Sequence, residues 1–353
     1  MISSQAVSRV IDANLNRVGE GLRLLEDVAR LLLNDATSTE HLKIMRHQLT
    51  SGDWSFNQQL IQSRDSEADV GIDIEVPDEE KERELPLVVV ANAKRVQESL
   101  RTLEELTKIP GVVSRLDPVK FKQARFGLYT IEQDLLSRLV RQDKVKRISG
   151  LYVIMDTEAL KGRSYTEVAN QVIRGGVKII QLRDKLSTRR ELLFVGRELK
   201  ELCSKHDVRF IVNDYLDIAL ATEADGLHLG QEDLPVKITR QLLPMGSILG
   251  YSVRTVEQAV SAEADGADYI AVGSMYPTLS KEGVEVVGLE RLRQIRQAVS
   301  LPLVAIGGIT DDNAAEVIAA GANSVAVISA ILGSESPEEA TRQIVDRIQV
   351  ANE

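Results

Sequence analysis

Two patterns of apolar and polar residues divide the chain. Up to about residue 140, apolar residues recur at the spacing of an amphipathic helix: Val18, Leu22 and Leu25 share one face, and Leu15 and Leu32 extend the stripe. From about residue 147, short continuous apolar runs alternate with helix-length segments. The chain is therefore expected to fold as an all-α part followed by an α/β domain.

The second pattern contains eight apolar runs: GLYVIMD, VKIIQLRD, RFIVND, GLHLG, ILGYSV, YIAVGS, PLVAIGG and SVAVISA. Continuous runs are typical of parallel strands that helices cover on both faces. Eight such units favour a (β/α)8 TIM barrel over an open doubly wound sheet, and no GxGxxG motif follows the first run. We expect a helical accessory domain at residues 1–143 and a catalytic barrel at 144–353.

The helical half contains an internal repeat. Residues 13–31 align without gaps to residues 91–109 with nine of nineteen positions identical, and a weaker match extends the repeat to 13–49 and 91–128. This predicts a duplicated helical hairpin. The repeated polar residues, such as Arg17 and Glu20, form either a solvated face or a site. An acidic loop is expected between the copies, because residues 65–84 hold ten acids and two bases.

Composition narrows the classes of function. A net charge of −10 argues against nucleic-acid binding, and Cys203 is the only cysteine, so neither an intrachain disulfide nor a cysteine metal site is expected. The chain shows no signal-peptide core and no membrane-spanning segment, which predicts a cytoplasmic protein without a membrane partner. Small-molecule substrates fit this composition. A homo-oligomer is compatible with it.

Polar residues follow the apolar runs, where a barrel places its active site. After the second run, Gln181, Arg183 and Lys185 alternate and so point to the same side of the strand. Because Arg and Gln on an inward face are costly to bury without a partner, this group predicts an anion clamp.

The third and fourth runs lead into Asp214 and Asp233. Adjacent strands lie about 4.8 Å apart, so both carboxylates can reach one cation. Two carboxylates with substrate phosphates are a common set of Mg²⁺ ligands, so Mg²⁺ is the expected cofactor. His228 in the fourth run is interpreted as an orienting or packed residue.

The later runs offer further anion sites. Ser252 lies near the end of the fifth run, and the sixth is followed by PTLSK, which contains Thr278, Ser280 and Lys281. Gly307 and Gly308 end the seventh run and Ser329 lies in the eighth, where this fold commonly binds phosphate. No Ser-His-Asp set or well-placed general base is evident. The pattern indicates chemistry by charge stabilisation of a leaving diphosphate.

These motifs resemble thiamine-phosphate synthases. The matching segments are QLRDK, VNDYLDIALATEADGLHLGQED, LGYSV, GADYIAVGSMYPTLSK, VAIGGI and VAVISAI, in family order over residues 148–350. The resemblance implies that 4-amino-2-methyl-5-hydroxymethylpyrimidine diphosphate and a thiazole phosphate are joined to thiamine phosphate with release of diphosphate. It implies that the C–O bond to diphosphate breaks first. It leaves open whether a carboxylated precursor replaces the thiazole.

The resemblance also implies roles for individual residues, with Lys281, Arg183 and Ser252 as the catalytic set. The pyrimidine diphosphate would be held by Gln181, Leu182, Arg183, Asp184, Lys185, Asn213, Ser252 and Lys281. Thr278, Ser280, Gly308, Ile328 and Ser329 would bind the thiazole phosphate, and Asp214 and Asp233 would bind Mg²⁺. The sequence departs from the family at Ser274, often Pro, and at Ser280, often Thr.

Two alternatives stay open. One is a thiazole tautomerase on the same barrel, which would need neither diphosphate nor Mg²⁺. The other is a non-catalytic thiamine-phosphate sensor with the helical half as its output. The complete anion clamp, the paired acids and Lys281 weigh against the tautomerase, and the expected metal site weighs against the sensor. The helical half is similar to an extension fused to this synthase in some bacteria, and we expect it to be unnecessary for the chemistry of the barrel.

Overall fold

The protein divides into two compact units. In this computed structural model the described residues are 4–65, 84–109, 116–278 and 285–352. One unit comprises Met1–Val140 and the other Arg141–Glu353. Within the described residues no helix is long and apolar enough to cross a membrane.

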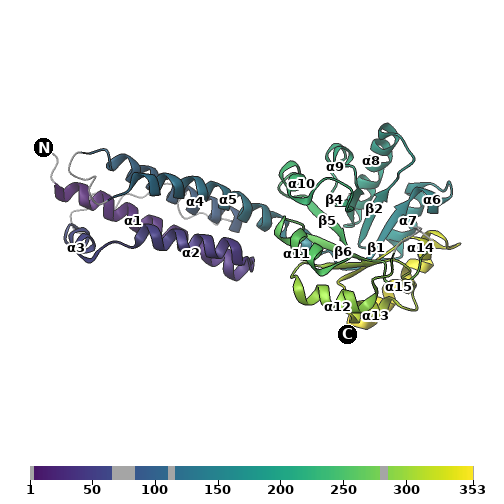
Figure 1. Cartoon of the computed structure of the whole chain (residues 1–353). Helices are drawn as coiled ribbons and strands as arrows, with labels where there is room; N and C mark the ends of the chain where they lie inside the picture. Colours follow the sequence, from purple (N-terminus) through teal and green to yellow (C-terminus); the bar gives the residue numbers. More distant parts are fainter. Residues whose placement is uncertain (1–3, 66–83, 110–115, 279–284, 353) are drawn as a thin grey trace. The chain divides into compact units, whose positions relative to one another are not determined.

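The first unit is helical (Figure 1). Its elements are α1 (Ser4–Asp27), the π-helical turn η1 (Val28–Leu32), α2 (Ala36–Thr50), α3 (Trp54–Gln62), α4 (Leu85–Leu106) and α5 (Pro118–Lys146), whose last residues belong to the second unit. The stripe of Val18, Leu22 and Leu25 is fully buried, as predicted. The extension of that stripe to Leu32 was wrong. Leu32 is 47% exposed, because the wider π turn shifts the phase of the helix after Asp27.

The internal repeat is visible in the packing of this unit. Helix α1 of the first copy packs against α4 of the second, and Gly21 permits the close approach because a Cβ there would lie 2.4 Å from Val96. Each copy carries the same ion pair. Arg46 donates to Glu26 at 2.8 Å in the first, and Arg125 donates to Glu104 at 3.2 Å in the second. Residues 66–83, which make up most of the acidic segment between the copies, lie outside the described part of the chain.

The second unit is the predicted (β/α)8 barrel. All eight apolar runs form parallel strands, which close in sequence order from β1 to β8 (Figure 1). The strands are β1 (Gly150–Asp156), β2 (Ile179–Arg183), β3 (Arg209–Asn213), β4 (Gly226–Leu229), β5 (Ile248–Val253), β6 (Tyr269–Gly273), β7 (Leu303–Ile306) and β8 (Ser324–Val327).

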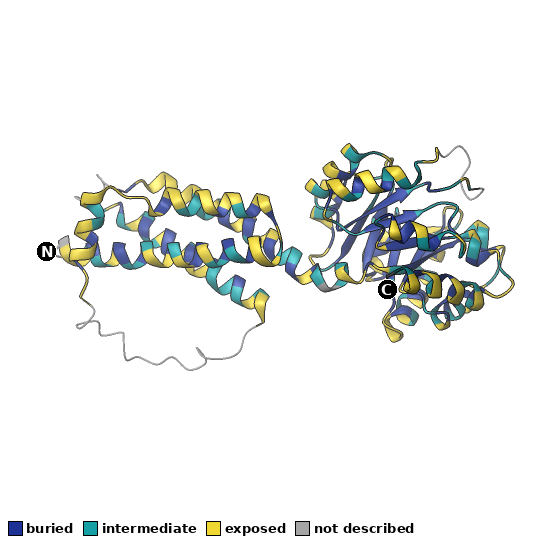
Figure 2. Ribbon diagram, turned by 90° about the horizontal axis from the view of Figure 1, so that it is seen from below, coloured by how far each residue is buried: buried dark blue, intermediate teal, exposed yellow. Residues whose placement is uncertain are grey.

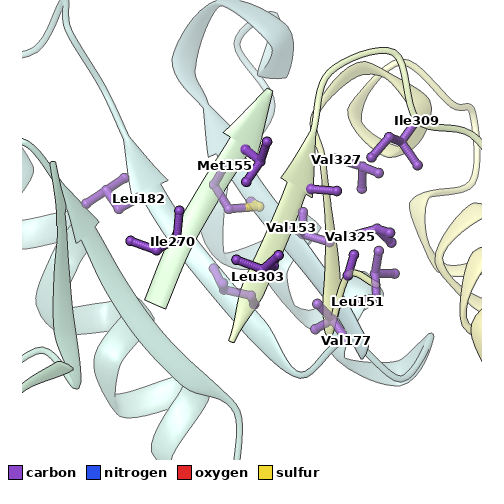
Figure 3. Close-up of a cluster of buried hydrophobic side chains, with 14 of the residues drawn as sticks. Leu151, Val153, Met155, Val177, Leu182, Ile270, Leu303, Ile309, Val325 and Val327 are labelled. Carbon is purple, nitrogen blue, oxygen red and sulfur yellow. The ribbon is translucent and has the colours of Figure 1, made fainter. Parts of the chain in front are cut away.

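Helices surround these strands. They are α6 (Thr157–Leu160), α7 (Tyr165–Arg174), α8 (Arg189–Lys205), α9 (Leu216–Ala221), α10 (Val236–Leu242), α11 (Val256–Ala264), α12 (Gly288–Ala298), α13 (Ala314–Ala319), α14 (Ser329–Leu332) and α15 (Pro337–Asn352). Their outward faces are exposed and the strands are buried (Figure 2). Strand side chains alternate in direction, so β1 places Leu151 and Val153 in the layer beneath the helices (Figure 3) and Tyr152 and Ile154 inside the barrel.

The first residues of the second unit are anchored to the ends of the strands opposite the predicted site. Arg141 is 4% exposed, and its guanidinium donates to Asp268 at 2.8 Å. Asp268 also accepts from Arg240 at 3.0 Å and from the backbone N–H of Leu249. Lys144 donates to the carbonyl of Gly246 at 2.8 Å. The C-terminal part of α5 is thus a structural part of the barrel unit.

Candidate active site

A cavity of about 480 Å³ opens at the carboxyl ends of the strands. It brings together residues from all eight strands or the loops that follow them. Ile154, Ala271, Ile306 and Ala326 give it an apolar lining, and the charged and polar groups come from the carboxyl ends of the strands and from the loops that follow them. The predicted residues that line it are Gln181, Arg183, Lys185, Asn213, Asp214, Asp233, Ser252, Thr278, Gly308, Ile328 and Ser329.

The residues of the predicted anion clamp lie on one side of the cavity. Gln181 is 2% exposed and donates from Nε2 to Tyr152 at 2.7 Å. The guanidinium of Arg183 donates to Asp156, whose carboxylate also accepts from the backbone N–H groups of Glu158 and Ala159 at the start of α6. Asp156 therefore fixes the direction of the Arg183 side chain while the cation still faces the cavity.

The two predicted metal ligands are close neighbours. Asp214 follows β3 with a left-handed backbone (φ 61°), and Lys185 Nζ lies 3.4 Å from its Oδ2. Burial and the neighbouring Asp233 raise the pKa of Asp214 to about 6, against the opposing effect of Lys185. Asp233 is held by the backbone N–H of Gly230, which donates to its Oδ2 at 2.7 Å.

This pair suits Mg²⁺. Within the described residues no group of three or more His, Cys, Asp or Glu side chains could enclose an ion, so a closed protein cage is absent there. Two carboxylates at the edge of an open cavity match the way Mg²⁺ is commonly held, with water and phosphate oxygens as further ligands. Burial and the neighbouring Asp233 both disfavour the ionised form of Asp214, and a bound cation would favour it.

Glycine shapes the opposite side of the cavity, after β7. Gly307 and Gly308 have φ values of 102° and 65°. A Cβ at Gly307 would lie 2.0 Å from Ser274 Oγ, and one at Gly308 would lie 2.7 Å from the carbonyl oxygen of Pro277. The backbone there thus approaches the β6 loop closely. Ile328 and Ser329 follow β8 beside it and also line the cavity.

His228 is a buried, neutral member of the site. Its Nε2 lies 2.9 Å from Ser252 Oγ, and its Nδ1 lies 2.9 Å from the hydroxyl of Tyr269. Burial lowers the pKa of His228 to about 4, with a smaller opposing effect from Asp233. Both ring nitrogens are thus engaged by neighbouring hydroxyl groups, which hold the ring in place. This geometry agrees with the interpretation of His228 as an orienting residue.

Four predicted residues lie elsewhere or outside the described chain. The Leu182 side chain is 1% exposed and packs in the cluster beneath the helices (Figure 3). Asp184 turns away from the cavity and accepts from the backbone N–H groups of Leu186 and Ser187, each at 2.9 Å. Ser280 and Lys281 fall in the range 279–284, outside the described residues.

Sequence reasoning missed Asp156 and Arg254. Asp156 ends the first apolar run just as Asp214 follows the third, so the same signal was present. Arg254 lines the cavity and is two residues after Ser252, which places both on the same side of the extended chain. Of the cations lining the described part of the cavity, Arg183 and Lys185 have acidic partners, whereas no ion pair joins Arg254 to a described residue.

Family models match both halves of the chain. The model described as thiamine monophosphate synthase matches residues 151–331, and the model of the ThiD2 family matches residues 9–134. A curated thiamine-phosphate synthase of Synechocystis sp. is 36% identical over 99% of this chain and 98% of its own length. The chain belongs to the thiamine-phosphate synthase family.

Other relatives separate the two halves. A thiamine-phosphate synthase of Methanospirillum hungatei is 50% identical over 198 residues, which cover 56% of this chain and 96% of that protein. A solved thiamine phosphate pyrophosphorylase from Pyrococcus furiosus is 38% identical, with a TM-score of 0.54 over 60% of this chain and 98% of its own. Family members of about the length of the barrel therefore exist beside the two-part Synechocystis relative.

Proposed function

We propose that this enzyme joins 4-amino-2-methyl-5-hydroxymethylpyrimidine diphosphate to a thiazole phosphate, and that it releases thiamine phosphate and diphosphate. The observation that carries the proposal is the cavity itself. One side offers cations and paired acids from β2 to β4, and the other offers glycine backbone after β7 and a serine after β8. Two phosphorylated substrates fit such a cavity with their reacting ends between the two sides.

The bond changes need no general base. The C–O bond between the pyrimidine methylene and diphosphate breaks, and its electron pair leaves with the diphosphate. The electron-rich pyrimidine stabilises the resulting cation, and the lone pair of the thiazole nitrogen then forms the new C–N bond. That nitrogen carries no proton, so none has to be removed. The neutral His228, whose two ring nitrogens are already engaged by Ser252 and Tyr269, supports this route.

The residues of this chain would act by holding charge. Arg183, fixed by Asp156, and Lys185 would bind the diphosphate together with Ser252. The apolar lining, which includes the small side chains of Ala271 and Ala326, would hold the pyrimidine ring and keep water away from the cation. Lys281 enters the proposal on sequence resemblance alone, as a further diphosphate cation.

Asp214 and Asp233 would hold Mg²⁺, which when bound supplies positive charge that neutralises the diphosphate. On the other side, Thr278, Gly308, Ile328 and Ser329 would bind the phosphate of the thiazole, with Ser280 added by resemblance. The backbone at Gly308 can approach a phosphate closely because no side chain intervenes.

Turnover of the full-length protein tests the proposal. With both substrates and MgCl₂ we expect thiamine phosphate and diphosphate in equal amounts. A folded protein that forms neither would overturn it and favour the sensor. Isomerisation of a thiazole phosphate without the pyrimidine substrate would favour the tautomerase. That reaction involves no diphosphate, so it would give Arg183 and the paired acids no ligand to bind.

A further inference from the structure

A chain of four hydrogen bonds crosses the interior of the barrel beneath the cavity. Gln181 Nε2 donates to the hydroxyl of Tyr152 at 2.7 Å, and that hydroxyl lies 3.1 Å from the hydroxyl of Tyr269. Tyr269 in turn lies 2.9 Å from His228 Nδ1, and His228 Nε2 lies 2.9 Å from Ser252 Oγ. The five residues come from β2, β1, β6, β4 and β5, and the two end residues line the cavity.

The interior is built to accommodate this chain. Tyr152 and Tyr269 are 1% and 0% exposed, and the cluster around them is otherwise aliphatic. The Tyr269 ring lies against Gly250 of β5, where a Cβ would approach its Cζ to 2.0 Å. Polar groups in such a place are costly unless every one is satisfied, so a complete chain is a specific feature of the barrel core.

The chain can run in only two directions. A tyrosine or serine hydroxyl has one proton to donate, and a neutral imidazole has one N–H and one bare nitrogen. A tyrosine proton that stayed outside these hydrogen bonds would be buried among aliphatic side chains without an acceptor, so reversing one hydrogen bond reverses all of them. Gln181 would rotate its amide, and His228 would change tautomer. The groups at the two ends must change their roles together.

The substrates select one direction. Diphosphate oxygens only accept hydrogen bonds, so Ser252 must donate to them and must itself accept from His228 Nε2–H. His228 Nδ1 then accepts from Tyr269, and Tyr269 accepts from Tyr152. Tyr152 accepts from Gln181 Nε2, which leaves the Gln181 carbonyl oxygen as the acceptor that faces the cavity. An exocyclic amino group on the pyrimidine supplies the matching donor.

We propose that Tyr152, Tyr269 and His228 are positioning residues that fix His228 in the Nε2–H tautomer and thereby set both ends of the pyrimidine-diphosphate site. Ser252 is held as a donor for the diphosphate, and Gln181 is held as an acceptor for the amino group. This inference rests on the proposed function for the identity of the ligand. The tautomer itself can be measured without following turnover.

Nitrogen NMR of the full-length protein tests the tautomer directly. The chain has four histidines, and the signal of His228 is assigned by its loss in His228→Asn. Between pH 6 and 8 we expect protonated Nε2 and bare Nδ1. An Nδ1–H tautomer, or an equal mixture, in an active enzyme would overturn the inference. A wild-type protein that shows the expected tautomer but makes no thiamine phosphate would overturn the proposed function instead.

Removing one hydroxyl group from the series of hydrogen bonds tests its role in substrate binding. In Tyr269→Phe we expect a mixture of His228 tautomers and a KM for the pyrimidine diphosphate about tenfold higher, since the donor to Nδ1 is lost. The KM for the thiazole phosphate should not change. Tyr276→Phe is the matched control, because its hydroxyl bonds Glu316 away from the cavity lining. An unchanged tautomer together with an unchanged KM would contradict the proposal.

A second substitution keeps the test decisive if Tyr269→Phe does not fold. Tyr152→Phe interrupts the chain nearer Gln181 and leaves the hydrogen bonds from Tyr269 to Ser252 in place. We expect it to keep the Nε2–H tautomer and still to raise the KM for the pyrimidine diphosphate. If both tyrosine variants melt like the wild type and neither KM changes, the hydroxyls only fill space and the proposal fails.

Discussion

Single residues in the cavity differ in whether their charge is already paired. Arg183 is held by Asp156, and Lys185 lies beside Asp214, so both are positioned before a substrate arrives. No ion pair joins Arg254 to a described residue, and its side chain is exposed. A cation held by an acidic partner binds the substrate in a fixed orientation. A cation without such a partner adds positive charge to the cavity, and its removal breaks no ion pair of the fold.

Arg254→Ala should therefore weaken substrate binding without destabilising the fold. We expect the KM of one phosphorylated substrate to rise about tenfold, the scale of one charge-assisted hydrogen bond. The free energy of unfolding should change by less than about 0.5 kcal/mol. Arg197→Ala, on an exposed position of α8, is the control. If both KM values stay at the wild-type level, Arg254 has no role in binding.

Asp214→Asn should have opposite effects with and without metal. Burial and Asp233 raise the pKa of Asp214 to about 6, so at pH 7.5 its ionised form destabilises the metal-free protein. The variant should then be more stable by about 1–2 kcal/mol, and this gain should shrink as the pH falls through about 6 and vanish near pH 4. Its apparent Mg²⁺ affinity should fall at least about tenfold.

Denaturation at several pH values and activity at limiting Mg²⁺ measure the two effects. The control is Asp217→Asn, whose side chain is 64% exposed. An Asp214→Asn protein that is less stable than the wild type without metal, or that needs no additional Mg²⁺, would show that the acids do not form the inferred pair.

The sequence predicted those site residues whose position depends on one strand alone. Gln181, Arg183 and Lys185 alternate along one strand end, and strand periodicity was enough to predict that all three face the cavity. Partners across strands were not predictable in this way. Tyr152 and Tyr269 are 117 residues apart and meet only because the closed barrel sets the stagger of β1 and β6.

Elements were predicted where their apolar pattern is continuous or strictly periodic. The eight strands follow from runs long enough to be buried on both faces. The phase change at η1, which leaves Leu32 exposed, has no comparable sequence signal. The loop between β2 and α8 is a second case. Asp184 was assigned to the pyrimidine diphosphate with its neighbours Arg183 and Lys185, but its carboxylate accepts hydrogen bonds from the backbone of the loop.

The Asp184 hydrogen bonds should make that loop sensitive to acid. Burial alone would raise the pKa of Asp184, but hydrogen bonds from Ser187 and Leu186 lower it from 3.8 to about 2. A lowered pKa adds stability above pH 4 that is lost as the pH falls towards 2. Asp184→Asn should cost about 1–2 kcal/mol at pH 7 and nothing at pH 2. Urea denaturation at both pH values measures this, and an equal cost at both would contradict it.

The paired hairpins of the helical unit should respond alike to mutation. Glu26→Gln and Glu104→Gln each remove the carboxylate of an ion pair in which Glu and Arg are both less than a quarter exposed. Each should lower the free energy of unfolding of that unit by about 1–3 kcal/mol. The double variant should be close to additive, because the pairs lie in separate copies. Strong non-additivity would mean that the copies are not independent.

At the scale of the whole molecule, the division between the units falls within one helix. The boundary predicted from the sequence was residue 143, whereas the compact barrel unit begins at Arg141. Three residues matter here because Arg141 is buried against Asp268. An apolar pattern along α5 carries no sign that one turn of it serves a different unit.

Two shortened chains separate these boundaries. A chain that begins at Ser137 keeps Arg141 and should retain the kcat/KM of the full-length protein. A chain that begins at Lys144 leaves Asp268 with Arg240 alone and should unfold more easily by about 1–3 kcal/mol. Circular dichroism melting and steady-state kinetics measure both. A folded chain from Ser137 that makes no thiamine phosphate would show that the helical unit contributes to catalysis.

The close packing of α1 on α4 at Gly21 also bears on the history of the chain. Two copies that cover each other's apolar faces are what the fusion of a homodimer would produce. In such a dimer each short chain would have buried its apolar face against a second copy. Fusion in tandem would have made that meeting intramolecular, so that it no longer depended on concentration. Residues 4–65 expressed by themselves correspond to one such copy, and we expect them to form a homodimer.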